Sequence, residues 1–250
     1  MQSLTVDQFL GGRLLIQQPT RGFRSGSDAV FLAASVSEGK PISVLDVGCG
    51  VGVASLCVAR RLPHVFVTGV DVMPSLIMLA QENAAANLLE DKVSFKVQDI
   101  SEPLSDLSPQ SFDCVISNPP YFQNSTLSHH PGRSKGRHYE DSFLREWVNF
   151  CFKMTKPRGM VHFIFPTPSL QALLNCFPSF VGGWEIFPLW PREDAPCSKR
   201  SLILARKGVK SPSTIHKGLV LHEIDAYTAA AKEVLWDGKG LFPEKLAMLP

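Results

Sequence analysis

The sequence lacks the features of secreted, zinc-binding and membrane-spanning proteins. Its six cysteines include no Cys-x-x-Cys pair, so we expect no structural zinc site and no metal. They are scattered singly, five of them in apolar segments or in a glycine-rich stretch, which favours buried free thiols in a reducing cytoplasm over disulfides. The N-terminus has no basic start followed by an apolar stretch, and no apolar run approaches the ~18 residues of a membrane-spanning helix. These absences predict a soluble cytoplasmic protein.

The sequence also has little net charge. Lysine and arginine total 25 against 23 acidic residues, and the resulting charge of +2 is too small to indicate a nucleic-acid partner from overall electrostatics. With 250 residues, 44% of them hydrophobic and 19% charged, the chain can bury a full core and is not expected to be disordered. If the protein binds RNA, the basic residues that bind it must be clustered.

Apolar β-branched runs alternate with segments of helical period, which predicts an α/β fold with a mostly parallel sheet covered by helices on both faces. The predicted strands are 42–48, 66–72, 93–99, 112–118 and 160–166, with 184–190 and 200–206 extending the sheet to seven strands as an antiparallel edge pair. The predicted helices are 52–62, 74–88 and 141–156, the last capped by Asp141 or Ser142, with shorter ones at 27–36 and about 225–236. Residues 119–140 are predicted to form a long polar loop. We divide the chain into an N-terminal extension (1–40), the sheet domain (41–207) and a C-terminal extension (208–250).

A glycine-rich stretch follows the first predicted strand and leads into a helix. It reads Asp46-Val-Gly48-Cys-Gly50-Val-Gly52. Glycines at alternate positions allow a tight turn and a close approach of the backbone to a ligand, and the helix that follows offers free N–H groups. This arrangement predicts a site for a nucleotide-like ligand.

Acidic residues end the next two predicted strands. Asp71 lies 21 residues beyond Gly50, where a carboxylate can accept both hydroxyls of a ribose, and Asp99 lies where an adenine edge would be. Turn capping is the alternative explanation for each residue alone. The glycine spacing is G-x-G-x-G after an acidic residue, and Asp46 would bind a cationic amino group while repelling a pyrophosphate. The ligand predicted from this pattern is S-adenosylmethionine rather than a dinucleotide.

With these motifs, residues 42–121 resemble the class I methyltransferases, whose fold is Rossmann-like. VLDVGCGVG matches their first cofactor-binding element and VDV, which ends at Val72, matches the second. The resemblance implies S-adenosylmethionine as the cofactor, bound by the glycines, by the acidic residues named above and by Val72.

The fourth predicted strand ends in Asn118-Pro119-Pro120-Tyr121. Two successive prolines restrict the backbone at the edge of the sheet where ligands bind. The Asn118 side-chain oxygen and the Pro119 carbonyl can then accept the two hydrogens of a planar NH2 group, and Tyr121 can stack on the group that carries it. This element resembles that of amino-methyltransferases acting on adenine N6 and that of release-factor glutamine methyltransferases.

Segments outside the central motifs resemble the bacterial group that includes the tRNA1(Val) adenine-37 N6-methyltransferases. They are GGRLLIQQPTRGFRSGSDAVFLAA near the N-terminus, SKRSLILARKG, and LVLHEIDAYTAAAKEVL. The resemblance implies that Arg24 and Asp28 contribute to the cofactor site and that Asn118 contacts both cofactor and substrate. Release-factor enzymes usually carry a helical N-terminal domain of about seventy residues, which the roughly 40 residues before the sheet are too few to form.

Local charge supports an RNA substrate. Arg133, Lys135, Arg137 and His138 follow the Asn-Pro-Pro-Tyr element, and residues 192–217 hold seven lysines or arginines against two acidic residues. Phosphates could bind on both sides of the active site, although a solvated surface explains either cluster nearly as well. We therefore expect an N6-adenine methyltransferase acting on RNA, with the anticodon loop of a tRNA as its expected target. A glutamine methyltransferase, a non-catalytic cofactor-binding module and a dinucleotide-dependent oxidoreductase stay open as alternatives.

Overall fold

The computed structural model describes residues 3–22, 24–37, 43–104, 106–120 and 133–242, with the backbone alone placed for 133–141. In chain order its elements are β1 (Leu4–Phe9), β2 (Leu14–Pro19), α1 (Ser27–Ala34), β3 (Ser43–Val47), α2 (Val53–Arg61), β4 (Phe66–Asp71), α3 (Pro74–Ala86), β5 (Val93–Val97), β6 (Phe112–Ser117), α4 (Arg133–Met154), β7 (Thr155–Pro166), α5 (Leu170–Leu174), β8 (Val181–Trp190), β9 (Arg200–Lys207), β10 (Thr214–Ile215), β11 (Leu219–Val220) and α6 (Ala229–Leu235).

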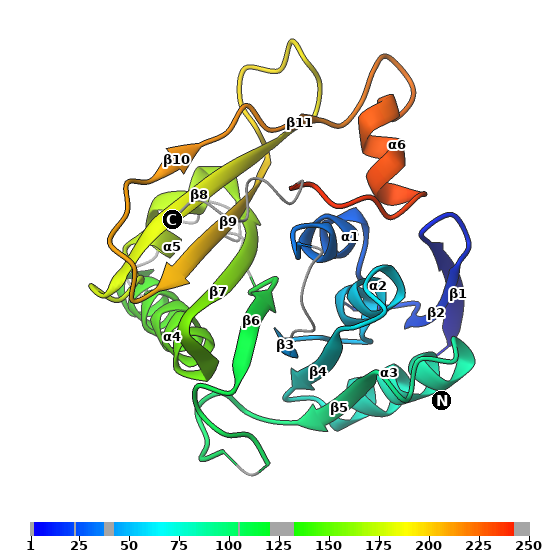
Figure 1. Cartoon of the computed structure of the whole chain (residues 1–250), viewed down its shortest axis with the longest axis horizontal. Helices are drawn as coiled ribbons and strands as arrows, with labels where there is room; N and C mark the ends of the chain where they lie inside the picture. The colour runs from blue at the N-terminus through cyan, green and yellow to red at the C-terminus, as the bar shows by residue number, and fades with distance from the viewer. Residues whose placement is uncertain (1–2, 23, 38–42, 105, 121–132, 243–250) are drawn as a thin grey trace.

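One sheet organises the fold, with strand order β10-β8-β9-β7-β6-β3-β4-β5 and β11 paired with β8 (Figure 1). Strands β7, β6, β3, β4 and β5 are parallel to one another, whereas β9 is antiparallel to both of its neighbours. The α/β architecture and the antiparallel β8–β9 pair are therefore confirmed. The two-residue strands β10 and β11 extend the sheet beyond the seven predicted strands.

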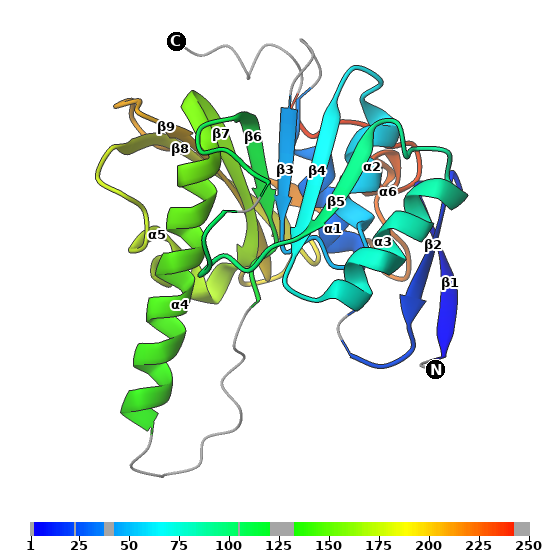
Figure 2. The same cartoon turned by 90° about the horizontal axis from the view of Figure 1, so that it is seen from below.

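Helices cover both faces of this sheet, as Figures 1 and 2 show. On one face α1, α2, α3 and α6 pack over alternate strand residues such as Val44, Ile116 and Leu202. On the other face α4 and α5 cover the intervening residues, among them Leu45 and Phe163. This alternation explains why the parallel strands read as continuous apolar runs, since both of their faces are buried.

A separate two-stranded hairpin, β1–β2, packs against α3 and was not predicted from the sequence. The side-chain amide of Asn83 accepts from the Gln17 N–H and donates to the Gln17 carbonyl, and Asn87 makes the same pair of bonds with Leu15. Two asparagines one helical turn apart thus take the place of a neighbouring strand. Asn83 also donates to the carbonyl of Val51, which links the hairpin to the glycine-rich stretch.

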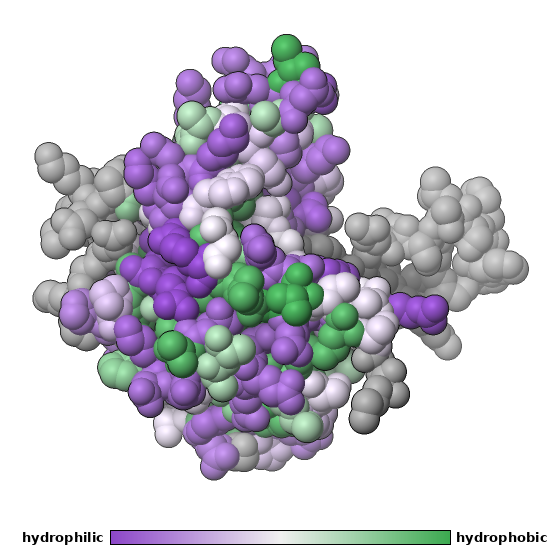
Figure 3. Space-filling model, turned by 90° about the vertical axis from the view of Figure 1, so that its right-hand side faces the viewer, coloured by the Kyte–Doolittle hydropathy of each residue, from purple (hydrophilic) through white to green (hydrophobic). Residues whose placement is uncertain are grey.

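The outward face of the hairpin lies on the side of the molecule shown in Figure 3, where hydrophobic residues are interspersed with hydrophilic ones. Three apolar side chains of the hairpin, Leu4, Val6 and Leu15, are exposed.

Helix α4 differs most from its prediction. It begins at Arg133, eight residues before the expected start, and ends at Met154. The cap predicted at Asp141 or Ser142 is wrong, because both residues lie inside the helix. The predicted loop of 119–140 is also wrong over 133–140, and its residues 121–132 lie outside the described part of the chain. In Figure 2 the first turns of α4 project beyond the edge of the sheet.

The cysteines follow the prediction, since all six are free and only Cys197 is exposed. Within the described ranges, no helix is long and apolar enough to cross a membrane. The same residues include no group of three or more His, Cys, Asp or Glu side chains that could hold a metal ion.

Candidate active site

The register of the parallel strands brings the predicted motifs to one edge of the sheet. Val47, at the end of β3, pairs with Ser117 at the end of β6 and with Val70 near the end of β4. Asp71 pairs in turn with Val97 at the end of β5. The glycine-rich stretch, the two strand-end carboxylates and the Asn-Pro-Pro element therefore lie side by side at the carboxyl ends of the strands, where ligands bind in open α/β sheets.

The three glycines of the stretch have positive φ angles of 74°, 56° and 87° at positions 48, 50 and 52, a region that favours glycine. Protein atoms cover two of them. A Cβ at Gly48 would come within 2.7 Å of the Trp147 ring, and one at Gly52 within 2.6 Å of Phe95. A Cβ at Gly50 would meet no atom within 4 Å. Gly50 itself is buried, yet the space beside its Cα holds no protein atom.

Asp46 lies almost fully buried beneath this turn, at 2% exposure. Its carboxylate accepts a hydrogen bond from the Ser55 hydroxyl at 2.7 Å and another from the Ser55 backbone N–H. Gly52 precedes α2 without a side-chain cap, so Asp46 acts as the acceptor at the start of that helix. Burial raises the pKa of Asp46 to about 6, although the Ser55 bonds oppose the increase, and the Asp71 carboxylate adds to it.

Asp71 and Asp99 both accept hydrogen bonds from nearby residues. The half-buried Asp71 carboxylate accepts from the Gly50 N–H at 3.0 Å and from the Met73 N–H at 2.9 Å. Asp71 therefore fixes the position of Gly50 within the turn. Asp99 accepts from the backbone and the hydroxyl of Ser101, and these bonds lower the pKa of its carboxyl group. Both carboxylates therefore cap a turn, which is the alternative explanation given for each residue alone. Both also lie at the carboxyl edge of the sheet, where the cofactor site was predicted.

The Asn-Pro-Pro element begins directly after β6, with Asn118 half-buried and Pro119 buried. Ser117, the residue before it, donates its hydroxyl to the Val47 carbonyl at 2.8 Å and accepts from the Trp147 indole N–H at 2.9 Å. The ring that packs on Gly48 is thus also bonded to the residue before Asn118. Tyr121, the predicted stacking residue, lies outside the described residues.

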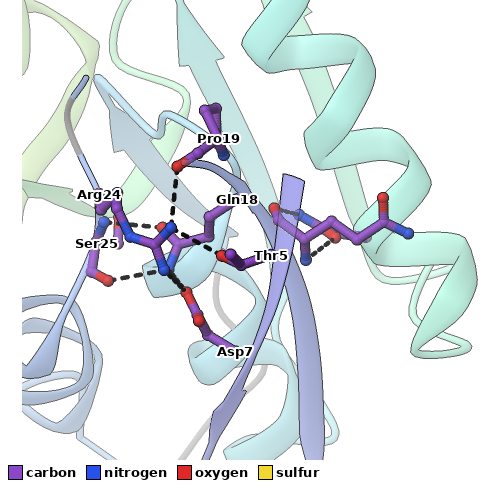
Figure 4. A network of polar contacts seen from close by, with 8 residues as sticks. Thr5, Asp7, Gln18, Pro19, Arg24 and Ser25 are labelled. Carbon is purple, nitrogen blue, oxygen red and sulfur yellow. Dashed lines mark hydrogen bonds and ion pairs between the residues drawn. The ribbon is translucent and has the colours of Figure 1, made fainter. Parts of the chain in front are cut away.

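Arg24 and Asp28 hold the N-terminal segment at the same edge. Arg24 pairs with Asp7 and donates to Thr5 and to the Pro19 carbonyl, so it ties the segment before α1 to the hairpin (Figure 4). Asp28, in the first turn of α1, accepts from Arg200 at 2.9 Å. Their predicted contact with the cofactor stays a prediction.

Comparison with known proteins agrees with this arrangement. Residues 38–160 match a family model described as a methyltransferase domain. The tRNA1(Val) (adenine(37)-N6)-methyltransferase of Porphyromonas gingivalis is 31% identical over 68% of this chain and 69% of its own length. This chain belongs to that methyltransferase family. The enzyme of the same name from Vibrio cholerae is 28% identical over 86% of this chain and 88% of its own length.

Solved structures agree on the fold of this methyltransferase. A predicted O-methyltransferase from Agrobacterium tumefaciens superposes with a TM-score of 0.72 at 22% identity, over 86% of this chain and 98% of its own. The geranyl diphosphate C-methyltransferase of Streptomyces coelicolor, solved with S-adenosyl-L-homocysteine, reaches 0.51 at 15% identity over 73% of this chain and 79% of its own. The protein is an S-adenosylmethionine-dependent methyltransferase with the predicted Rossmann-like fold.

Two site residues of the methyltransferase were missed from sequence. Trp147 lies within the predicted helix 141–156, and nothing in its spacing indicates a contact with Gly48 or Ser117. Ser55 lies three residues after the last glycine, at the third position of α2. A serine at that position, preceded by an acidic residue at the end of a strand, is a signal that could have suggested the Asp46 bond.

The predicted basic cluster of 192–217 is divided by the fold of the methyltransferase. Arg192, Lys199 and Arg200 lie at the active-site edge, whereas β9 carries the chain to Lys207 and Lys210 at the opposite edge. Lys207 donates to the carbonyls of Phe152 and Thr155, at the end of α4. The side chains of the other predicted cluster, in 133–138, lie outside the described part of the chain.

Proposed function

We propose that this enzyme transfers a methyl group from S-adenosylmethionine to N6 of an adenine in tRNA, in the cytoplasm. The observation that carries the proposal is the position of Asn118 and Pro119, directly after β6 and beside the glycine turn at the end of β3. An acceptor pair at that place suits a planar NH2 group facing a methyl donor. The names of the relatives from Porphyromonas and Vibrio support adenine in tRNA as the bearer of that group.

The described residues suit S-adenosylmethionine. The space beside the Gly50 Cα, which holds no protein atom, gives the cofactor room next to the turn that Gly48 and Gly52 complete. The negative charge of Asp46, beneath the turn, favours the cationic amino group of the methionine moiety. Asp71 keeps lone pairs for the ribose hydroxyls, beside the exposed side chain of Val72. In this proposal Asp99 contacts the adenine of the cofactor, and Asn118 contacts its reacting end.

In the proposed reaction the enzyme acts mainly by aligning the adenine N6 with the methyl donor. When bound, S-adenosylmethionine supplies the methyl group and a positively charged sulfonium centre. The Asn118 side-chain oxygen and the Pro119 carbonyl accept the two N6 hydrogens of adenine, which directs the nitrogen lone pair toward the methyl carbon. As the new N–C bond forms, the electron pair of the broken S–C bond stays on the cofactor's sulfur, and N6 then releases its proton to solvent water. No strong base is needed, because the methylated nitrogen is cationic and acidic, and in-line alignment provides most of the acceleration.

The test is methylation of purified tRNA by the full chain with labelled S-adenosylmethionine, followed by nucleoside mass spectrometry. We expect N6-methyladenosine at a single tRNA position. Asn118→Ala should abolish transfer while S-adenosylhomocysteine affinity, measured by calorimetry, stays within a few-fold of the wild-type value. Loss of both together would show that Asn118 supports the fold of the site and would contradict its proposed role.

A parallel reaction with total protein examines the glutamine alternative, because the same acceptor pair can hold an amide NH2. If the label appears in N5-methylglutamine and none appears in tRNA, the substrate is a protein glutamine and the proposed substrate is wrong. Stabilisation by a nicotinamide cofactor and not by S-adenosylhomocysteine in a thermal-shift assay would contradict the cofactor assignment.

A further inference from the structure

A groove at the active-site edge has no role in the mechanism above. It has a volume of about 630 Å³ and lies between the β8–β9 loop and the segment that follows β11. That volume falls in the range of about 300–1,000 Å³ typical of ligand sites. In Figure 1 the two chain segments that border it lie beside each other at the top of the molecule. Its opening lies three strands along the sheet from the end of β6, or roughly 15 Å at the ~4.8 Å spacing of strands.

Both walls of the groove are held by hydrogen bonds within the chain. On one wall Ser198 donates its hydroxyl to Thr167, which directly follows β7, and the Thr167 N–H donates to the Lys199 carbonyl. The other wall joins the first where the N–H groups of Leu221 and His222 donate to the carbonyls of residues 190 and 191. The groove is therefore built from backbone that is anchored to the same strands as the active site.

The lining combines cations, carboxylates and a ring. Arg192 and Lys199 are exposed cations, and Asp194 and Asp225 are carboxylates that also line the groove. His222 lines it as well; its ring stacks on Tyr227 with centroids 4.4 Å apart, and its Nδ1 is 3.2 Å from the Pro191 carbonyl.

Two cations and two carboxylates do not suit a bare anion. They suit a ligand that carries a phosphate together with hydrogen-bond donors, such as a ribose hydroxyl or the amino group of a base. We propose that this groove binds a nucleotide of the tRNA strand near the methylated adenine, with Arg192 and Lys199 contacting its phosphate. The inference rests on the proposed function. Each such contact holds the position of the strand without reading its sequence.

The experiment compares substitutions within one basic stretch. Arg192→Ala, Lys199→Ala and the double variant remove the groove cations, and Lys210→Ala removes an exposed lysine of the same stretch at the opposite edge. We expect the double variant to raise the KM for tRNA at least about tenfold, since hydrogen bonds to charged groups are strong. The salt dependence of tRNA binding should weaken by about one charge per lost contact. The kcat at saturating tRNA and the affinity for S-adenosylhomocysteine should stay at wild-type values, and Lys210→Ala should change none of the four.

An unchanged KM and salt dependence in the double variant, while the wild type methylates tRNA, would overturn the groove assignment alone. An equal effect of Lys210→Ala would overturn it as well, because the effect would then follow total charge. If the groove serves a free nucleotide, AMP will bind in calorimetry with a dependence on Arg192 and Lys199, and the assignment to RNA is wrong. If the wild type methylates no tRNA, both this inference and the proposed function are overturned.

Discussion

The raised pKa of Asp46 leads to a quantitative prediction about cofactor binding. The carboxylate is buried beneath the glycine turn, and its pKa of about 6 lies above the ordinary value of 3.8. In the free enzyme its charge is therefore lost as the pH falls through about 6. A bound cofactor with a cationic amino group favours the ionised form and lowers this pKa. Because ionisation and binding are linked, protons compete with the cofactor below pH 6.

The magnitude follows from the free-enzyme pKa. With a pKa of about 6, roughly one molecule in eleven is ionised at pH 5 and ten in eleven at pH 7. If binding requires the ionised form, the affinity for S-adenosylhomocysteine falls about tenfold from pH 7 to pH 5 and is nearly constant above pH 7. In the absence of cofactor, the contribution of Asp46 to the stability of the fold changes with pH in the opposite direction to cofactor affinity: it falls as the pH rises. The unfolded chain ionises first as pH rises from about 4 to about 6, so this residue lowers stability over that range, by about 3 kcal/mol in all.

The assay is titration calorimetry with S-adenosylhomocysteine at several pH values between 5 and 8, for the wild type and two variants. Asp46→Asn keeps an acceptor for Ser55 but cannot ionise, so it should bind more weakly at pH 7 and lose the tenfold dependence on pH. Ser55→Ala removes a hydrogen bond that lowers the pKa of Asp46, and it should move the midpoint to higher pH. A flat wild-type profile, or an Asp46→Asn variant with the wild-type slope, would refute the reasoning.

Three further predictions concern the turn, the indole and the thiols. Gly52→Ala should lower the free energy of unfolding in urea by about 2–4 kcal/mol, because a clash with Phe95 adds to the strain of positive φ. Gly50→Ala should lower it by only about 1–2 kcal/mol and yet weaken cofactor binding. Equal losses of stability in the two variants would contradict the packing described. Trp147→Phe should cost about 1 kcal/mol for its lost hydrogen bond and lower kcat more than cofactor affinity, and a change in stability alone would limit the indole to a structural role. A thiol reagent should modify one cysteine, Cys197, in the native protein and all six after unfolding, because the others are buried; a second fast-reacting thiol would disagree with this burial.

The sequence predicted most of the central sheet because parallel strands with two buried faces appear as apolar β-branched runs. It did not reveal the hairpin at 4–19, although two short alternating runs around Gly11-Gly12 are a hairpin signal. It also placed the start of α4 eight residues late. Residues 133–140 carry almost no apolar side chains, so their helix has no hydrophobic period to detect.

The sequence by itself determined the glycine turn, the carboxylates at the strand ends and the Asn-Pro-Pro element, because each depends on residues that are close together along the chain. Only the tertiary structure decided how these parts act on one another. Trp147 meets Gly48 and Ser117 because α4 crosses the sheet beside β6, and such contacts leave no local pattern. The basic stretch after residue 191 is continuous in sequence, yet β9 separates Arg200 from Lys207 by roughly 23 Å at ~3.3 Å per residue. For this reason the Arg192–Arg200 part lies at the active-site edge while Lys207 and Lys210 lie at the opposite edge, and charge counted along the chain could not separate them.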